Sequence, residues 1–134
     1  MITTPLPLNR LALLQYNVNK SRRKVMIGLL EDPRINDIDI LAIQEPWRNP
    51  INRAGYNPIN SQFLLIEEIS KNTRSAIYIN KRIPTNIWSE VHKEQDLITI
   101  QLQLQEIRIY IHAIYIEPPN SHSERQTPEV LYKL

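Results

Sequence analysis

The chain has 134 residues, a hydrophobic fraction of 42% and a formal net charge of +2, which suits one domain with a real core and argues against disorder. It contains no cysteine and only two glycines, which excludes disulfides, thiolate metal sites, cysteine nucleophiles and glycine-rich phosphate loops, and fits an intracellular protein. The small positive charge permits a nucleic-acid partner without requiring one. The sequence shows neither a membrane span nor a secretory signal.

The first part of the chain has the pattern of a strand–helix–strand unit. Apolar residues predict a strand over Leu11–Val18. A helix is expected over Arg22–Glu31, with Ser21 as its N-cap and Pro33 as the residue that stops it. The apolar run that follows predicts a second strand over Asp39–Glu45, buried and too short to span a membrane.

The rest of the chain is predicted to be mostly β-structure. A loop rich in asparagine and proline covers residues 46–61. Strands are then expected over residues 63–67, 74–80, 97–104 and 108–116. The last of these is almost entirely apolar, which predicts a central strand buried on both faces. A tight hairpin is expected at Gln105-Glu106, and a final helix from Thr127 and Pro128. This order of elements indicates a mixed sheet or a two-layer sandwich with helices outside.

Polar side chains at the ends of the predicted strands are the candidates for function. An unpaired buried carboxylate is costly, so Glu45 should be exposed, paired or bound to a metal. If the first two strands are parallel neighbours, Asn17 and Glu45 emerge at the same edge, where their oxygens suit Mg²⁺. The alternative is that Asn17 caps the helix and Glu45 is a solvated acid. Tyr115, near the end of the last strand, can bond a phosphate or simply pack.

A basic cluster lies at the start of the predicted helix. It consists of Lys20, Arg22, Arg23 and Lys24. Cations in a first helical turn oppose the helix dipole by about 0.3–1 kcal/mol each, a cost that nucleic-acid phosphates would offset. The alternative is a solvated basic face. The three histidines have no metal-ligand spacing, and no serine has the context of a hydrolase nucleophile.

Four segments, in order along the chain, resemble the endonuclease/exonuclease/phosphatase family, and within it the endonuclease domain of fungal non-LTR retrotransposons. They are Leu14–Val18, Asp39–Trp47, Arg74–Lys81, and Ile111–Tyr115 with the Pro118–Ser121 that follows. The resemblance implies an α/β fold. Residues 11–134, after an extended segment over residues 1–10, would form the truncated N-terminal part of a four-layer α/β sandwich. It also implies divalent-metal-dependent cleavage of DNA, with Mg²⁺ or alternatively Mn²⁺, and a nuclear location.

The resemblance also implies roles for individual residues. Glu45 would bind the metal, Asn17 would support the metal or the scissile phosphate, and Tyr115 would contact the phosphate. These three are the predicted catalytic residues, and Glu45 and Asn17 are the predicted metal ligands. Asn120 is expected to contact nucleic acid together with the basic cluster.

The chain departs from the family pattern in ways that limit this expectation. The Gly-Asp-x-Asn segment and the later acid and histidine do not occur in it, Ala113 replaces a usual asparagine, and Glu117 shifts the Pro-Pro step. We therefore expect a truncated, catalytically incomplete endonuclease-like domain. Half a sandwich would also leave an apolar sheet face uncovered, which predicts association. The alternatives are a non-catalytic nucleic-acid-binding remnant, a small-substrate phosphatase of the same superfamily, and an unrelated α/β interaction domain.

Overall fold

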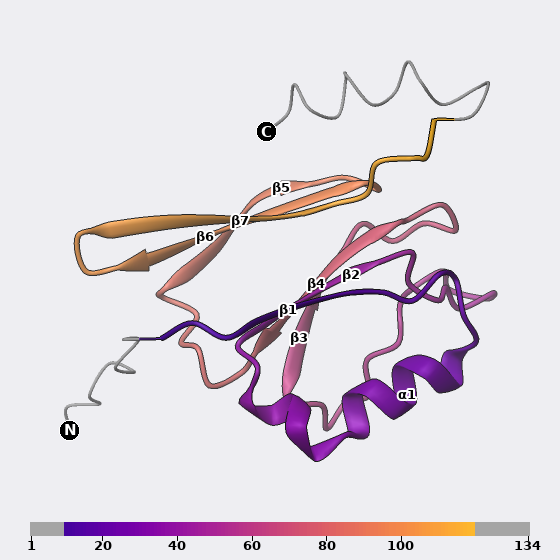
Figure 1. The fold of residues 1–134 in the computed structure, drawn as a ribbon, viewed down its shortest axis with the longest axis horizontal. Helices are drawn as coiled ribbons and strands as arrows, with labels where there is room; N and C mark the ends of the chain where they lie inside the picture. Colours follow the sequence, from indigo (N-terminus) through magenta and orange to yellow (C-terminus); the bar gives the residue numbers. More distant parts are fainter. Residues whose placement is uncertain (1–9, 120–134) are drawn as a thin grey trace.

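A computed structural model describes residues 10–119, which form one helical layer and two β-sheets (Figure 1). The elements are β1 (Leu13–Asn17), α1 (Arg23–Glu31), a 3-10 helix (Pro33–Asp37), β2 (Ile40–Gln44), β3 (Phe63–Ile66), β4 (Ser75–Asn80), β5 (Trp88–Lys93), β6 (Leu97–Leu104) and β7 (Ile107–Ile114). One sheet has the order β1-β2-β4-β3, and the other has the order β5-β6-β7. Figure 1 shows the three-stranded sheet on one side of the four-stranded sheet and α1 on the other.

The four-stranded sheet is covered on both faces, and this explains its apolar sequence. One face packs against the three-stranded sheet through residues such as Ile77, Ile79 and Ile100. The opposite face packs against α1 and the 3-10 helix through residues such as Met26 and Tyr78. Every residue of β2 and β4 is consequently buried. Side chains of these central strands can reach solvent only beyond the strand ends.

The predicted strand–helix–strand unit is confirmed, since β1 and β2 are parallel neighbours. The other pairings in this sheet are antiparallel, so the sheet is mixed, as expected. The helix begins one residue later than predicted, and the assignment of Ser21 as its N-cap is wrong. The Ser21 N–H instead donates to the Val18 carbonyl at 2.9 Å, so Ser21 belongs to the turn after β1. Arg22 occupies the cap position and makes no side-chain capping bond.

The strand expected over residues 108–116 is present as β7, but its predicted central position is wrong. β7 pairs only with β6 among the described strands and forms an edge of the three-stranded sheet. Its side chains alternate between the core, as with Ile111, and solvent, as with Tyr110. An apolar composition alone therefore did not distinguish a central strand from an edge strand. β6 holds the central place, with Ile98, Ile100 and Leu102 facing the core.

Two elements were not predicted from the sequence. The 3-10 helix follows Pro33, which does end α1 as expected. β5 is largely exposed along its length, and its pairing with β6 shifts register between Glu90 and His92. Such a bulge interrupts the alternation of apolar and polar residues by which a strand is detected in sequence. β5 therefore left no periodic pattern to find.

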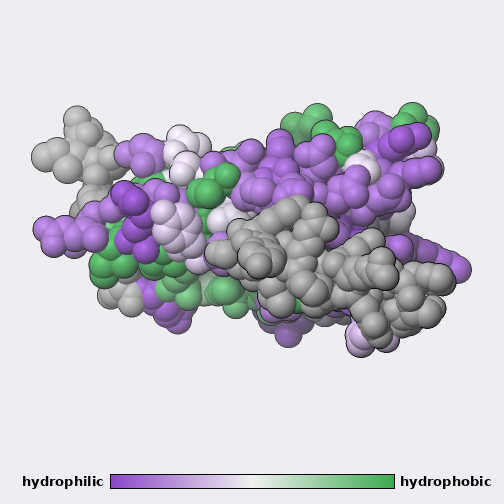
Figure 2. Space-filling model, turned by 90° about the horizontal axis from the view of Figure 1, so that it is seen from above, coloured by the Kyte–Doolittle hydropathy of each residue, from purple (hydrophilic) through white to green (hydrophobic). Residues whose placement is uncertain are grey.

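The prediction that half a sandwich leaves an apolar sheet face uncovered is also wrong, because the described residues form two sheets that pack against each other. The outward-facing residues of the three-stranded sheet are mostly polar. They include Thr99, Gln101, Gln103, Arg108, Tyr110 and His112. Figure 2, which looks onto this side of the molecule, shows mainly hydrophilic side chains where described residues are visible. The described part of this face is therefore not the uncovered apolar surface that we expected.

Three sequence-based predictions lie outside the described residues. These are the extended N-terminal segment up to residue 9, the helix at Thr127 and Pro128, and the contact at Asn120. Within residues 10–119, neither helix is long and apolar enough to cross a membrane.

The packing between the sheets predicts a large difference between two isoleucines of the three-stranded sheet. Ile100 is fully buried between the sheets, whereas Ile107 is 63% exposed. Ile100→Ala should lower the free energy of unfolding by about 2–5 kcal/mol, and Ile107→Ala should change it by less than about 0.5 kcal/mol. Urea denaturation measures both values. Equal effects of the two substitutions would contradict the described packing.

Candidate functional site

At one end of the sandwich, the apolar core between the sheets gives way to amide side chains. Asn17 of β1 lies opposite Gln44 of β2 in the parallel register. The Gln15 side chain donates to Gln44 Oε1 at 3.3 Å. These residues, with Glu45 and with Tyr115 from beyond β7, line an open cavity of about 380 Å³. The cavity therefore lies where the two sheets separate.

Glu45 leaves β2 through an unusual backbone conformation. Its φ is 52°, a value that residues with a side chain seldom adopt. Two backbone hydrogen bonds hold it there: its N–H donates to the Arg74 carbonyl at 2.8 Å, and its carbonyl accepts from the Lys20 N–H at 2.9 Å. Strained backbone of this kind persists only where the surroundings fix it, and it is concentrated at functional sites. It directs the chain out of the sheet at the carboxylate.

Tyr115 is fixed beside Glu45 by its backbone and by its ring. Its N–H donates to the Asp96 carbonyl at 2.9 Å, and the Arg74 guanidinium lies over the ring, 4.7 Å from its centroid. Burial is the main reason why the pKa of Tyr115 is raised. The negative charge of Glu45 and the hydrogen bond between the phenol and the Glu45 side chain raise it further. The positive charge of Arg74 opposes this rise. The phenol therefore stays protonated and available as a donor.

Arg74 connects the two sheets at this end of the molecule. It donates two hydrogen bonds to the Asp96 carboxylate, at 2.8 and 2.7 Å, and lies 3.5 Å from Glu117. The hydrogen bond to Asp96 is the main reason why the pKa of Arg74 is raised. Asp96 precedes β6, and its carbonyl also accepts from the Ser75 hydroxyl at the start of β4. The site is thus held by contacts that join both sheets.

The oxygens at the cavity fit a hydrated Mg²⁺ ion. Glu45 supplies one carboxylate, and Asn17 Oδ1 accepts a single hydrogen bond, from the Asn19 N–H at 2.7 Å, which leaves a lone pair free. Within residues 10–119 no three acidic or histidine side chains are grouped closely enough to enclose a metal. Mg²⁺ commonly keeps several waters and binds through one or two carboxylates together with substrate phosphates. The residues present suit that open type of site.

The structure brings some of the predicted residues together and separates others. Asn17, Glu45 and Tyr115 line the same cavity. Of the basic cluster, Lys20 lies next to this site because its backbone N–H donates to the Glu45 carbonyl. Arg22 and Lys24 are exposed at the start of α1 and do not line the cavity.

The remaining cation of the cluster, Arg23, contacts the ring of Tyr56, 5.9 Å from its centroid. It therefore has a packing contact on α1, away from the cavity.

Sequence reasoning missed Arg74 and Asp96 as parts of the site. Arg74 begins one of the four segments that carry the family resemblance, which was a usable signal. Asp96 lies in a short turn between two strands, and nothing in the sequence marks it.

Comparisons with known proteins identify the fold. No protein-family model matches the chain, and no curated protein matches it. Among solved structures, it is similar to the endonuclease domain of TRAS1, a telomere-specific non-LTR retrotransposon, with a TM-score of 0.58 and 11% sequence identity. The chain has an endonuclease-like α/β fold. The match covers 92% of this chain and 52% of the other, so the chain spans about half the length of the structure that it resembles.

This likeness bears on each prediction to a different extent. The predicted α/β fold class is confirmed, and the resemblance found in four sequence segments is supported at the level of the fold. At 11% identity, the likeness concerns the fold alone. The roles of Glu45, Asn17 and Tyr115 stay predictions that rest on the family resemblance, and the structure adds that the three residues line one cavity.

The contacts of Tyr115 predict opposite effects of two neighbouring substitutions on its pKa. Glu45→Gln removes a negative charge and should lower the pKa of Tyr115, whereas Arg74→Met removes a positive charge and should raise it. The phenolate absorbance, titrated with pH and compared with that of Tyr115→Phe, measures both shifts. If neither substitution moves the titration, Tyr115 does not lie between these two charges.

Proposed function

We propose that this chain carries the metal-binding part of a nucleic-acid phosphodiesterase site. Glu45 and Asn17 would hold Mg²⁺, or alternatively Mn²⁺, and DNA would be the substrate. The observation that carries the proposal is the convergence of Glu45, Asn17 and Tyr115 on one cavity at the ends of parallel strands. The likeness to a retrotransposon endonuclease domain supports a nucleic-acid substrate. A nuclear, intracellular location belongs to the same proposal.

Each residue has a distinct task in this proposal. When bound, the metal would polarise a phosphoryl oxygen and stabilise the charge that develops during cleavage. Glu45 supplies the negative charge that attracts the ion. The Tyr115 phenol lies against Arg74 and is hydrogen-bonded to the Glu45 side chain in the free protein, and in this proposal it would donate to a phosphate oxygen of the substrate. Asn17 contributes a neutral oxygen rather than a second carboxylate. The negative charge of the site therefore stays small enough for an anionic phosphodiester to enter.

We further propose that this chain, acting alone, binds metal and DNA but does not cleave. Phosphodiester hydrolysis needs a group that activates or orients water. Among the described residues, the two histidines lie on the three-stranded sheet, away from the cavity. His112 Nδ1 is hydrogen-bonded to the Thr99 hydroxyl at 2.8 Å, and His92 pairs with Glu94. Neither histidine would act at Glu45. The sequence also contains neither the Gly-Asp-x-Asn segment nor the later acid and histidine, to which the family resemblance assigns the activation of water and contact with the phosphate.

Catalytic incompleteness predicts that the purified chain does not nick DNA. Supercoiled plasmid incubated with the protein and Mg²⁺ or Mn²⁺ should stay supercoiled, as judged by gel electrophoresis against a protein-free control. Nicking by the wild type that Glu45→Gln abolishes would contradict this prediction and would show that the chain forms a complete nuclease.

The proposed metal role of Glu45 predicts a selective loss of ion binding. Mn²⁺ titration followed by electron paramagnetic resonance should show a site whose affinity falls roughly tenfold or more in Glu45→Gln. The matched control is Glu106→Gln, which removes the same charge from an exposed residue in the turn between β6 and β7. Equal affinity in the wild type and Glu45→Gln would exclude Glu45 as a ligand.

A further inference from the structure

A second cavity, of about 480 Å³, lies beside the one that holds Glu45. Four cationic side chains and one indole ring line it: Lys20, Arg48, Lys71, Arg74 and Trp47. None of the described residues that line it is acidic. We refer to it as the basic cavity. Its composition is that of an anion site with an aromatic wall.

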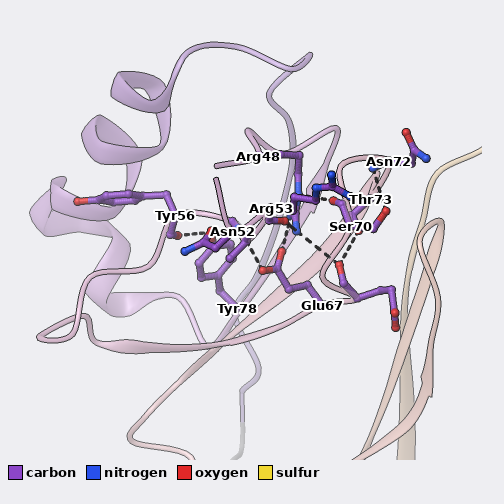
Figure 3. Close-up of polar contacts among 12 residues, drawn as sticks. Arg48, Asn52, Arg53, Tyr56, Glu67, Ser70, Asn72, Thr73 and Tyr78 are labelled. Carbon is purple, nitrogen blue, oxygen red and sulfur yellow. Dashed lines mark hydrogen bonds and ion pairs between the residues drawn. The ribbon is translucent and has the colours of Figure 1, made fainter. Parts of the chain in front are cut away.

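The wall of the basic cavity is built around the Arg48–Glu67 ion pair (Figure 3). Arg48 Nη1 lies 2.5 Å from Glu67 Oε1, and both side chains are at least nine-tenths buried. Arg48 also donates to the carbonyls of Ser70, at 3.0 Å, and Arg53, at 2.5 Å. Glu67 accepts in addition from the Gly55 N–H at 2.8 Å. One buried pair therefore ties the loop after β2 to the loop after β3.

Close packing at Gly55 shows how tightly this wall is assembled. A Cβ at position 55 would lie 2.9 Å from Glu67 Oε1, closer than such atoms normally approach. Glycine is therefore the residue that lets the loop backbone approach the ion pair. The position of the wall is set by packing as well as by charge.

The loop that carries Lys71 is braced by its own side chains. The Thr73 hydroxyl donates to the Glu68 carbonyl at 2.5 Å, and the Ser70 hydroxyl accepts from the Asn72 N–H at 3.0 Å. Gln95, from the turn before β6, donates to the same Ser70 hydroxyl at 3.1 Å. Figure 3 shows Ser70, Asn72 and Thr73 gathered in this loop beside Arg48. Lys71 thus projects from a fixed backbone.

The four cations differ in how far their charge is already neutralised. Arg48 is paired with Glu67, and Arg74 with Asp96 and Glu117. Lys20 and Lys71 are exposed, and neither has an ion pair with another described residue. The two arginines therefore shape the cavity, while the two lysines supply the charge that remains to attract an anion.

The basic cavity lies next to the proposed metal site. Pro46 and Trp47 directly follow Glu45 in the chain, and Lys20 is bonded to the Glu45 carbonyl through its N–H. Arg74 lines the basic cavity and also lies over the ring of Tyr115, which lines the other. An anion in the basic cavity would lie next to whatever occupies the Glu45 site.

We propose that the basic cavity binds a backbone phosphate of a nucleic-acid strand, next to the phosphate that the Glu45 site would take. Lys20 and Lys71 are its charged ligands, and Trp47 offers a face on which a base or sugar can pack. The position of the neighbouring phosphate rests on the proposed function, whereas anion binding by the cavity does not. A nucleic-acid strand carries phosphates in series, so it can place one in the basic cavity and the next beside a metal ion held at Glu45, which a free phosphate cannot do.

The test measures binding of a fluorescent DNA duplex to the full chain by anisotropy, in EDTA so that no metal contributes. Lys20→Gln and Lys71→Gln should each weaken binding several-fold and lower the slope of log affinity against log salt by about 1. Lys81→Gln is the matched control, because this exposed lysine follows β4 at the end opposite Arg74. Circular dichroism checks that all variants are folded.

Three outcomes overturn the inference. The first is wild-type affinity in both lysine variants, and the second is an equal loss in the Lys81→Gln control. The third is displacement of the duplex by another anion as efficiently as by competitor DNA. Inorganic phosphate and a polyglutamate peptide serve as these anions, each at a concentration of phosphate or carboxylate groups equal to that of the phosphates in the competitor DNA. Failure of the proposed function is recognised separately: Mn²⁺ affinity would be unchanged in Glu45→Gln, while the two lysine variants still lost DNA affinity.

Discussion

The site depends on one constraint, which is that β2 is covered on both faces. α1 lies on one side and the three-stranded sheet lies on the other, so no side chain of β2 from Ile40 to Gln44 reaches solvent freely. A carboxylate within this strand would be strongly destabilising. Glu45 is acceptable only because it is the first residue beyond the buried run, where the positive φ turns the chain away. Burial thus determines where polar chemistry can appear.

Parallel pairing then decides which residues meet there. Because β1 and β2 run in the same direction, Asn17 and Gln44 end at the same edge. The third partner, Tyr115, comes from the other sheet, and it is held in place by Asp96 and Arg74. These contacts couple the position of the phenol to the packing of both sheets. The candidate site is therefore a property of the assembled sandwich and of no single segment.

Much of the fold could be predicted from the sequence because its central elements have strong periodic patterns. The apolar run of β2 and the alternation along β6 indicated buried strands, and both are present. The edge elements were harder to assign. β7 is as apolar as a central strand but has one described neighbour, and β5 is solvated and bulged. Whether a strand is central or at an edge depends on which strands pair with it, and a local sequence pattern carries no information about those partners.

The candidate site divides in the same way. Glu45, Asn17 and Tyr115 could be singled out because they stand at the ends of recognisable strands and in segments that resemble a family. Asp96 and Lys71 lie in loops that only tertiary contacts bring to the site. The result is a pair of adjoining cavities, one built around a carboxylate and amides and the other around cations. This arrangement is complementary to a metal ion bound beside a phosphodiester chain.

The most direct test of this account is the position of a bound ion. Crystals of the chain soaked in Mn²⁺ should give an anomalous difference peak beside the Glu45 carboxylate and the Asn17 side-chain oxygen. The peak should be absent from crystals of Glu45→Gln treated in the same way. A peak at another group of residues, with none at Glu45, would contradict the assignment of this strand end as the metal site.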